Sequence, residues 1–321
     1  MNTRHHIFLT AAAVLCAISC REQLPCGSSS LIRISPEMYP AAMSRAEEPD
    51  MHVVYGTSFP AGRQICVSAS HLSCRGPASP RTYLKDVMFY SDSSGEWKSS
   101  GLWPAEGTLS FLCLSVEDFS HLAGVEWGEL CSDSVAMHVS DFDTIQDDIL
   151  VGACGEIKRP DKDGPVPVIF SHSLSLLSLK MEVDGESPLA DGLSLEVDGM
   201  ELQDVMTEAD LNVIREGSLV SHHWSGHSAA KNLTLFPGRQ ILVIPQCPAE
   251  ALVRYSLHDS CGQTTHFERM VSLAATSGPG RADEWQSGKH YIYHLHFSLT
   301  DFHLEAAVED WTGDNVEVRF K

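Results

Sequence analysis

Positive charge is scarce in this sequence. Lysine and arginine together number 22, against 43 aspartate and glutamate residues, and the formal net charge at pH 7 is −21. A chain this acidic is repelled by the phosphates of nucleic acid and by anionic lipid headgroups. We therefore expect no nucleic-acid partner and no electrostatic attachment to a membrane surface.

Motifs of several enzyme classes are also missing. The sequence has no G-x-S-x-G nucleophile elbow, no P-loop and no dinucleotide fingerprint. No two cysteines form a C-x-x-C pair, so neither a zinc knuckle nor a thioredoxin-type redox pair is indicated. Asp147 and Asp148 are adjacent, so on a strand they point to opposite faces and cannot converge on one glycosidic bond. We expect no enzymatic activity and no cofactor.

One histidine-rich stretch, "SHHWSGH" (221–227), is the only cluster with the look of a metal site. His223 and His227 are four residues apart, a spacing that suits zinc only on a helix, and no glutamate lies between them as a hydrolytic base. Gly226 and the neighbouring serines favour a loop instead. We therefore expect that His222, His223 and His227 bind no metal.

Long hydrophobic runs are absent from the chain after the N-terminal region. No later segment approaches the roughly 20 apolar residues of a membrane helix. Residues 1–19 have the pattern of a secretory signal, with Arg4 before an apolar run over 7–18. The residues Ala17, Ile18 and Ser19 precede Cys20, as in a bacterial lipoprotein signal. We expect acyl chains on Cys20 to anchor the exported protein. The alternative is an ordinary secreted protein cut just before this cysteine.

Helical periodicity is scarce, and short apolar or alternating runs recur between Gly, Pro, Asp and Ser residues. Strands at this spacing are typical of β-sandwiches, so we predict an all-β fold. The segment "EIKRPDKDGPVP" (156–167) is dense in charge, proline and glycine and has the character of a linker. We predict two sandwiches in series, over residues 46–160 and 161–321, after an N-terminal segment over 20–45.

Cysteine pairing is a separate question, because an exported protein can carry disulfides. Cys247 and Cys261 flank two extended runs, so a disulfide between them could staple a hairpin. Free thiols in strands are the alternative.

Several landmarks follow one another along the chain. They are Trp103-Pro104, Asp148 to Leu150, Phe170 to Leu174, Gly288 to Tyr293, and Trp311. Because these landmarks stand in this order behind a lipoprotein signal, the sequence resembles the fimbrillin family of bacteroidete surface lipoproteins, the FimA/Mfa-like pilins. The resemblance implies two transthyretin-like, Greek-key sandwich domains on a lipid-anchored outer-membrane precursor. It also implies assembly into a fimbrium with other fimbrillin subunits, and a role in adhesion. His172 belongs to the same pattern, and we expect it to make a buried hydrogen bond.

The resemblance further implies that an N-terminal strand is cut away after an arginine. "LIRIS" (31–35) is a short alternating strand with Ile32 and Ile34 on one face, and Pro36 is expected to end it. Arg45-Ala46 follows in a polar stretch of the kind that a trypsin-like protease cuts. Arg33 is a competing basic site within the predicted strand.

The resemblance also implies that a neighbouring subunit's terminal strand fills the opened groove. Such a strand would cover the apolar surface of the groove and pair with its free backbone N–H and C=O groups. In "NVEVRFK" (315–321), Val316, Val318 and Phe320 alternate with Glu317 and Arg319. This segment is a candidate donor strand, although the last strand of an ordinary sandwich has the same pattern. The rival hypothesis is a surface lipoprotein that does not polymerise and binds a glycan or host protein through its loops. The fate of the N-terminal strand distinguishes the two.

Overall fold

The structure is a computed structural model of the chain. It describes residues 30–38, 59, 63–74, 79–92, 95–129, 133–143, 146–160, 164–183, 192–248, 250–273, 284–297 and 302–311. The described residues contain no α-helix, and a 3-10 turn over Phe119–His121 is their one helical element. Consistent with this, none of their helices is long and apolar enough to cross a membrane. The all-β prediction is confirmed.

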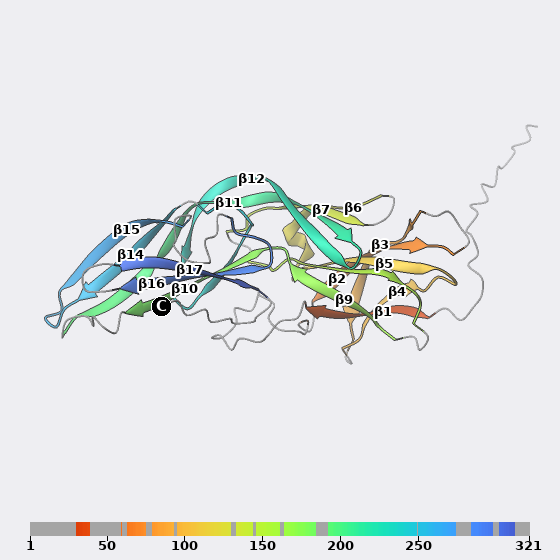
Figure 1. Ribbon diagram of the computed structural model, residues 1–321, viewed down its shortest axis with the longest axis horizontal. Coiled ribbons are helices and arrows are strands. Elements are labelled where there is room, and N and C mark those ends of the chain that lie inside the picture. The colour runs from red at the N-terminus through yellow and green to blue at the C-terminus, as the bar shows by residue number, and fades with distance from the viewer. Residues whose placement is uncertain are drawn as a thin grey trace, which may run out of the picture.

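Seven strands of the N-terminal half close into a barrel in the order β1-β4-β3-β2-β5-β8-β9 (Figure 1). Their bounds are β1 Leu31–Met38, β2 Gln64–Leu72, β3 Arg81–Ser91, β4 Trp97–Leu102, β5 Thr108–Ser115, β8 Leu150–Ile157 and β9 Val166–His172. The barrel interior is filled by alternate side chains of these strands, among them Ile65, Phe89, Leu109, Phe111 and Phe170.

The other described strands form two further sheets. One has the order β15-β14-β11-β7-β6, with β12 paired to β11, and the other has the order β13-β10-β16-β17. Their bounds are β6 Leu122–Trp127, β7 Ser134–Val139, β10 Ser175–Val183, β11 Ser194–Glu216, β12 Leu219–Leu235, β13 Gln240–Val243, β14 Glu250–His258, β15 Thr264–Ser272, β16 Lys289–Phe297 and β17 Phe302–Asp310.

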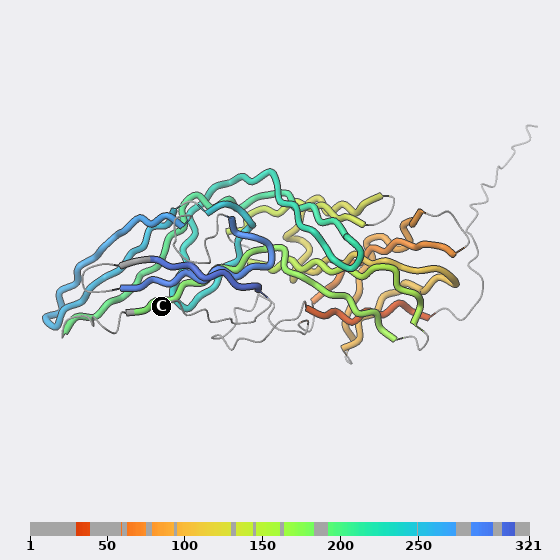
Figure 2. The backbone as a smooth tube through the Cα atoms, viewed as in Figure 1, coloured from red at the N-terminus to blue at the C-terminus, as the bar shows by residue number. Residues whose placement is uncertain are grey.

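The hairpin of β11 and β12 joins the two halves. β11 pairs with β14 through residues 194–202 and with β7 through residues 209–214, so a single strand belongs to both ends of the molecule. Bulges between Leu202 and Val205 and between Glu208 and Asp210 bend it. Figure 2 shows the resulting arch along the top of the molecule, reaching back over the barrel strands.

The packing follows the same division. β5 is buried on both faces: Leu109, Phe111 and Cys113 point into the barrel, while Leu112 and Leu114 point into a second core. That second core, at the junction of the halves, includes Val135 of β7, Leu211 of β11, Leu176 of β10 and Trp311. A third core, around Trp285, Tyr291 and Tyr293, lies between the two sheets of the C-terminal half.

These sheets cross the boundary expected near residue 160. β9 lies beyond it in the sequence but completes the barrel, and β6 and β7 lie before it but pair with the β11 sheet. Strand pairing over long sequence distances determines which sheet each strand joins. The linker-like composition of 156–167 marks only a local break in the strand pattern. The tandem transthyretin-like organisation stays a prediction.

Candidate functional site

The strand β1 closes the barrel and is the starting point of the candidate site. Ile32, Ile34 and Met38 are 0%, 1% and 6% exposed and point into the barrel core. Arg33 and Glu37 lie on the opposite face. Burial of each such apolar side chain is worth about 1.5–3 kcal/mol. The alternation in "LIRIS" therefore has the structural meaning that the sequence predicted.

The backbone of β1 is shared between two neighbours. Its first half pairs antiparallel with β4, where Ile34 is opposite Trp97, and its second half pairs parallel with β9, where Met38 is opposite Phe170. The strand continues through Pro36, which was expected to end it. Because the pairing with β4 stops at Ile34, the missing N–H of proline leaves that ladder intact.

We name the space that β1 fills between β4 and β9 the β1 slot. Its floor is aromatic: Phe59 packs edge-on against Trp97 of β4, with ring centroids 5.9 Å apart, and against Phe170 of β9, at 4.7 Å. Phe170 is placed by Gly152 on β8, since a Cβ there would meet the Phe170 ring at 2.8 Å. These rings remain in the protein if residues 20–45 are removed.

The outer face of β1 is held by charge. Arg33 lies 3.5 Å from Glu96, which is also 2.9 Å from Lys98. Arg33 is half-buried in a strand with neighbours on both sides, so its backbone is held in the barrel and cannot enter the active site of a protease without local unfolding. This geometry disfavours Arg33 as the competing cut site.

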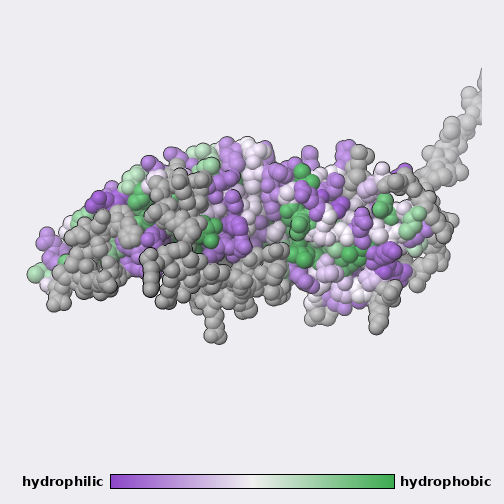
Figure 3. All heavy atoms as spheres, viewed as in Figure 1, coloured by the Kyte–Doolittle hydropathy of each residue, from purple (hydrophilic) through white to green (hydrophobic). Residues whose placement is uncertain are grey.

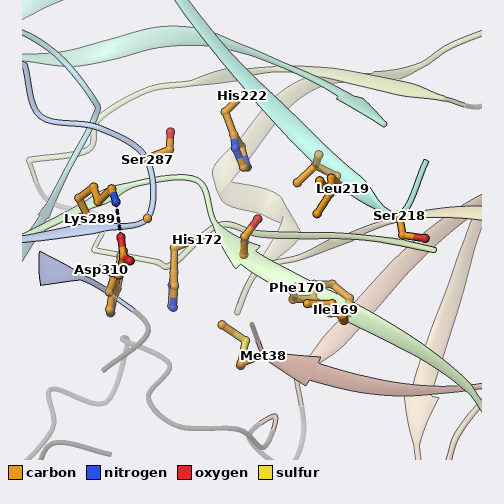
Figure 4. A pocket seen from close by; sticks show the side chains of 14 residues that line it. Met38, Ile169, Phe170, His172, Ser218, Leu219, His222, Ser287, Lys289 and Asp310 are labelled. Carbon is orange, nitrogen blue, oxygen red and sulfur yellow. Dashed lines mark hydrogen bonds and ion pairs between the residues drawn. The ribbon is translucent and has the colours of Figure 1, made fainter. Parts of the chain in front are cut away.

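A cavity of about 380 Å³ adjoins the end of the slot. We name it the junction pocket and define it by six of its lining residues: Met38, Phe170, Leu219, Val220, His222 and Trp311. Figure 4 shows Met38 at the end of β1, with Ile169 and Phe170 beside it on β9 and His222 pointing in from β12. Lys289 and Asp310 form an ion pair at its far side (Figure 4).

A buried polar chain ends in this pocket. Asp148 and His172 are 0% and 5% exposed, and their Oδ2 and Nδ1 atoms lie 3.0 Å apart. The His172 ring stacks on Trp311 at a centroid distance of 3.7 Å. The expectation that His172 makes a buried hydrogen bond is confirmed. The neighbouring Asp147 faces the other way and lies 3.1 Å from the Arg63 guanidinium, as expected for adjacent carboxylates.

Two ring nitrogens of the pocket have no hydrogen-bond partner among the described residues. They are Nε1 of Trp311 and Nε2 of His222, both buried. Burial lowers the pKa of His222 to about 4, with a further contribution from the nearby His223 and His172. The imidazole is therefore neutral at pH 7, and the hydrogen-bonding capacity of both ring nitrogens is unused among the described residues.

The histidines of "SHHWSGH" do not converge on one point. They lie on β12, which corrects the expectation of a loop: pairing with β11 continues through this segment. His222 lines the pocket, His223 is exposed, and His227 lies 2.8 Å from the carbonyl oxygen of Pro245. No group of three or more metal-ligating side chains is found in the part of the chain that the structure describes.

The staple between Cys247 and Cys261 is wrong in this structure, where both thiols are free and exposed. The two cysteines lie at opposite ends of β14, which spans nine residues, Glu250–His258. A strand of that length extends about 30 Å, whereas a disulfide needs Cα atoms within about 7 Å. The second extended run of the sequence forms β15, beyond the turn. Backbone pairing between β14 and β15 therefore holds the hairpin together instead of a disulfide.

Several predicted site residues lie outside the described residues. They are Cys20, Arg45, Ala46, Val316, Val318 and Phe320. Sequence reasoning missed Phe59, Trp97 and the junction pocket. Trp97 carried a weak signal, as an aromatic residue at the start of an extended run, but the pocket is assembled from five separate segments and has no local pattern.

The fold and the slot together define an all-β protein whose N-terminal barrel is closed by a strand from the start of the chain. The fimbrillin-like family model matches residues 52–311, and this chain belongs to that family.

Solved structures with a similar fold include a fimbrial protein from Bacteroides vulgatus, at 13% identity and a TM-score of 0.56, covering 87% of this chain and 99% of that one. The tip fimbrial protein Mfa3 from Porphyromonas gingivalis aligns at 10% identity and a TM-score of 0.35, over 78% and 95% of the two chains. A search of curated proteins finds no match.

Proposed function

We propose that this protein is a fimbrial subunit that is exported as a lipoprotein precursor, anchored to the outer membrane through Cys20, and assembled by strand exchange. Cleavage between Arg45 and Ala46 removes β1 together with the lipid. The segment with Val316, Val318 and Phe320 from a neighbouring subunit then takes the place of β1. In this proposal the protein is a structural component that supports adhesion, with no catalytic role.

One observation carries the proposal: the strand that closes the barrel is the one that lies before Arg45. Removing it opens the ladders of β4 and β9 at the same time and uncovers the apolar floor that Ile32, Ile34 and Met38 now cover. Such a gap is unstable in water because unpaired backbone groups and apolar surface are both exposed, and a donated strand satisfies both. Membership of the fimbrillin-like family supports the same conclusion.

The test is the N-terminus of the protein recovered from the cell surface, determined by intact mass and terminal peptide, with an unboiled gel for polymers. We expect the chain to begin at Ala46 and to form a high-mass ladder. The matched control is Arg45→Ala, which keeps β1 and should give monomers that begin at acylated Cys20.

A wild-type chain that begins at acylated Cys20 and gives no ladder would overturn the proposal. The protein would then be a tethered surface lipoprotein whose loops bind a glycan or a host protein.

A further inference from the structure

The junction pocket and the β1 slot share a wall, and that wall is the last buried side chain of β1. Met38 lines the pocket and pairs with Phe170, which lies on the pocket floor. β1 runs toward the middle of the molecule and ends there (Figure 1). Removal of β1 takes Met38 away, so the slot and the pocket become one continuous depression with its widest part at the inner end.

The surface around the inner end of the slot is apolar, and in the closed precursor no described residue covers its exposed apolar side chains. Ile169 and Leu219 are 43% and 67% exposed, although both line the pocket. Figure 3 shows hydrophobic side chains gathered on this face near the middle of the molecule. Exposed apolar patches of this kind mark binding surfaces more often than the rest of a protein surface. The pocket is therefore suited to a large apolar side chain.

Two residues that line the pocket each have a ring nitrogen whose hydrogen-bonding capacity is unused in the described part of the closed precursor. Nε1 of Trp311 and Nε2 of His222 are buried and have no partner among the described residues. A buried unpaired donor or acceptor costs free energy, and the N–H and C=O groups of an entering strand are suitable partners. An apolar side chain carried on an extended backbone matches both features of the site.

The candidate donor segment has such a side chain at one end only. Val316, Val318 and Phe320 alternate as Ile34, Pro36 and Met38 do, and Phe320 is the largest of the three. If the donor enters with the polarity of β1, Phe320 falls at the position of Met38. In the opposite polarity the same three positions place Phe320 at Ile34, whose side chain is 1% exposed, and the pocket receives only Val316.

We infer that the junction pocket receives the Phe320 side chain of a second copy of this chain, so that the donated strand runs antiparallel to β4 and parallel to β9. This inference rests on the proposed function and adds to it a polarity, a register and an anchor. The pocket then sets which strand ends fit, because a partner with a small residue at this position leaves it empty.

The first test uses the exported chain, residues 20–321, cut after Arg45 by limited proteolysis, and a peptide of residues 312–321 added after the protease is inhibited. The peptide carries p-benzoylphenylalanine in place of Phe320, and the photo-crosslink is mapped by mass spectrometry. We expect crosslinks to Leu219, Val220 or Ile169. Crosslinks to Trp97 or Val166, the partners of Ile34 in the slot, would mean the opposite polarity and would overturn the inference.

The second test compares affinities for the same cut protein. Phe320→Ala in the peptide should weaken binding roughly tenfold or more, as expected for a buried anchor, whereas Glu317→Ala, on the outward face, should change it by less than about twofold. Leu219→Asp in the protein replaces an exposed side chain, so the fold is kept. This change should weaken binding of the wild-type peptide but not binding of the Phe320→Ala peptide.

The outcomes separate the two proposals. If no peptide binds the cut protein, strand exchange itself fails and the anchor fails with it. If the wild-type and Phe320→Ala peptides bind equally well, strand exchange stands and the anchor pocket is wrong.

Discussion

The strands β1 and β17, the first and last in the described chain, are held in opposite ways. β1 has a neighbour on each side and pairs over only a few residues with either of them. β17 pairs with β16 in nine consecutive positions and, among the described residues, has no strand on its other side. One strand completes a closed barrel, whereas the other ends an open sheet.

This difference decides what the loss of each strand does. A barrel without β1 has two unpaired edges and an uncovered core, while the C-terminal sheet without β17 gains only a new edge at β16. The connections differ as well. β17 follows β16 within a few residues, but the next strand after β1 among the described residues begins at Gln64. β1 is thus essential to the barrel and joined to it by a long segment, a combination that suits a replaceable strand.

The largest expected effect is on the inward face of β1. Ile34→Ala removes buried methyl groups from a side chain that is 1% exposed, which should cost the precursor about 2–5 kcal/mol of unfolding free energy. Leu304→Ala, on the half-buried face of β17, is the matched change in the other region and should cost less.

The comparison becomes sharp after cleavage at Arg45 and exchange of the first strand. The effect of Ile34→Ala should then vanish, because residue 34 is gone, while that of Leu304→Ala should persist. Denaturant unfolding of each variant and of the wild type, before and after cleavage and exchange, measures both losses of unfolding free energy. If the cleaved barrel keeps its full unfolding free energy after β1 leaves and before a donor strand binds, the view that this strand closes the core is wrong.

A second prediction concerns pH and draws on one histidine from each region. Burial lowers the pKa of His222, beside the barrel, and of His290, in the C-terminal sheet, each to about 4. The unfolded chain takes up these protons near pH 6.5, while the folded chain does so only near pH 4. Stability is therefore lost as the pH falls through this window, by about 2 kcal/mol per histidine at pH 5.

Unfolding midpoints between pH 7 and pH 5 test this prediction. His222→Gln and His290→Gln should each flatten the pH dependence, and the double variant should flatten it further. Ser225→Ala, at an exposed position on the same strand, removes no titratable group, so it serves as the control and should leave the slope unchanged. Equal slopes in all the variants would mean that burial does not hold these imidazoles neutral.

A third and smaller effect is expected at the floor of the slot. Gly152→Ala places a methyl group 2.8 Å from the Phe170 ring, so the ring must move, at a cost of about 1–3 kcal/mol. Gly164→Ala is the matched control, since its added methyl group meets nothing within 4 Å. Because Phe170 also lies on the floor of the junction pocket, Gly152→Ala should weaken binding of the 312–321 peptide, and Gly164→Ala should not.

The sequence allowed the strands to be predicted better than their partners. Alternating side chains predicted β1, because burial of one face is a local pattern of period two. The parallel pairing of β1 with β9 and the pairing of β11 with both β14 and β7 could not be predicted, since neither depends on neighbours in the sequence. The same holds for the junction pocket, where Met38, Phe170, Leu219 and Trp311 come from distant parts of the chain.

Two errors have a common cause. The serines and Gly226 of "SHHWSGH" favour a loop locally, yet the ladder with β11 holds the segment in β12. Cys247 and Cys261 are near each other in the sequence, yet β14 runs straight between them and keeps them apart. In both cases the pairing of whole strands outweighs the preference of a few residues, as is usual in sheets.

The smallest expected effect is on the outward face of β1, and it separates the two faces of that strand. Arg33→Ala removes an ion pair with Glu96 in which both side chains are more than a third exposed, so it should cost less than about 1 kcal/mol. The contrast with Ile34→Ala, its immediate neighbour, tests whether β1 is held by its apolar face. Arg33→Ala should also leave the N-terminus of the processed chain at Ala46, because the backbone of β1 is held between β4 and β9. A change in the processed N-terminus would instead show that β1 leaves its slot before the protease acts, and that opening of the barrel precedes cleavage.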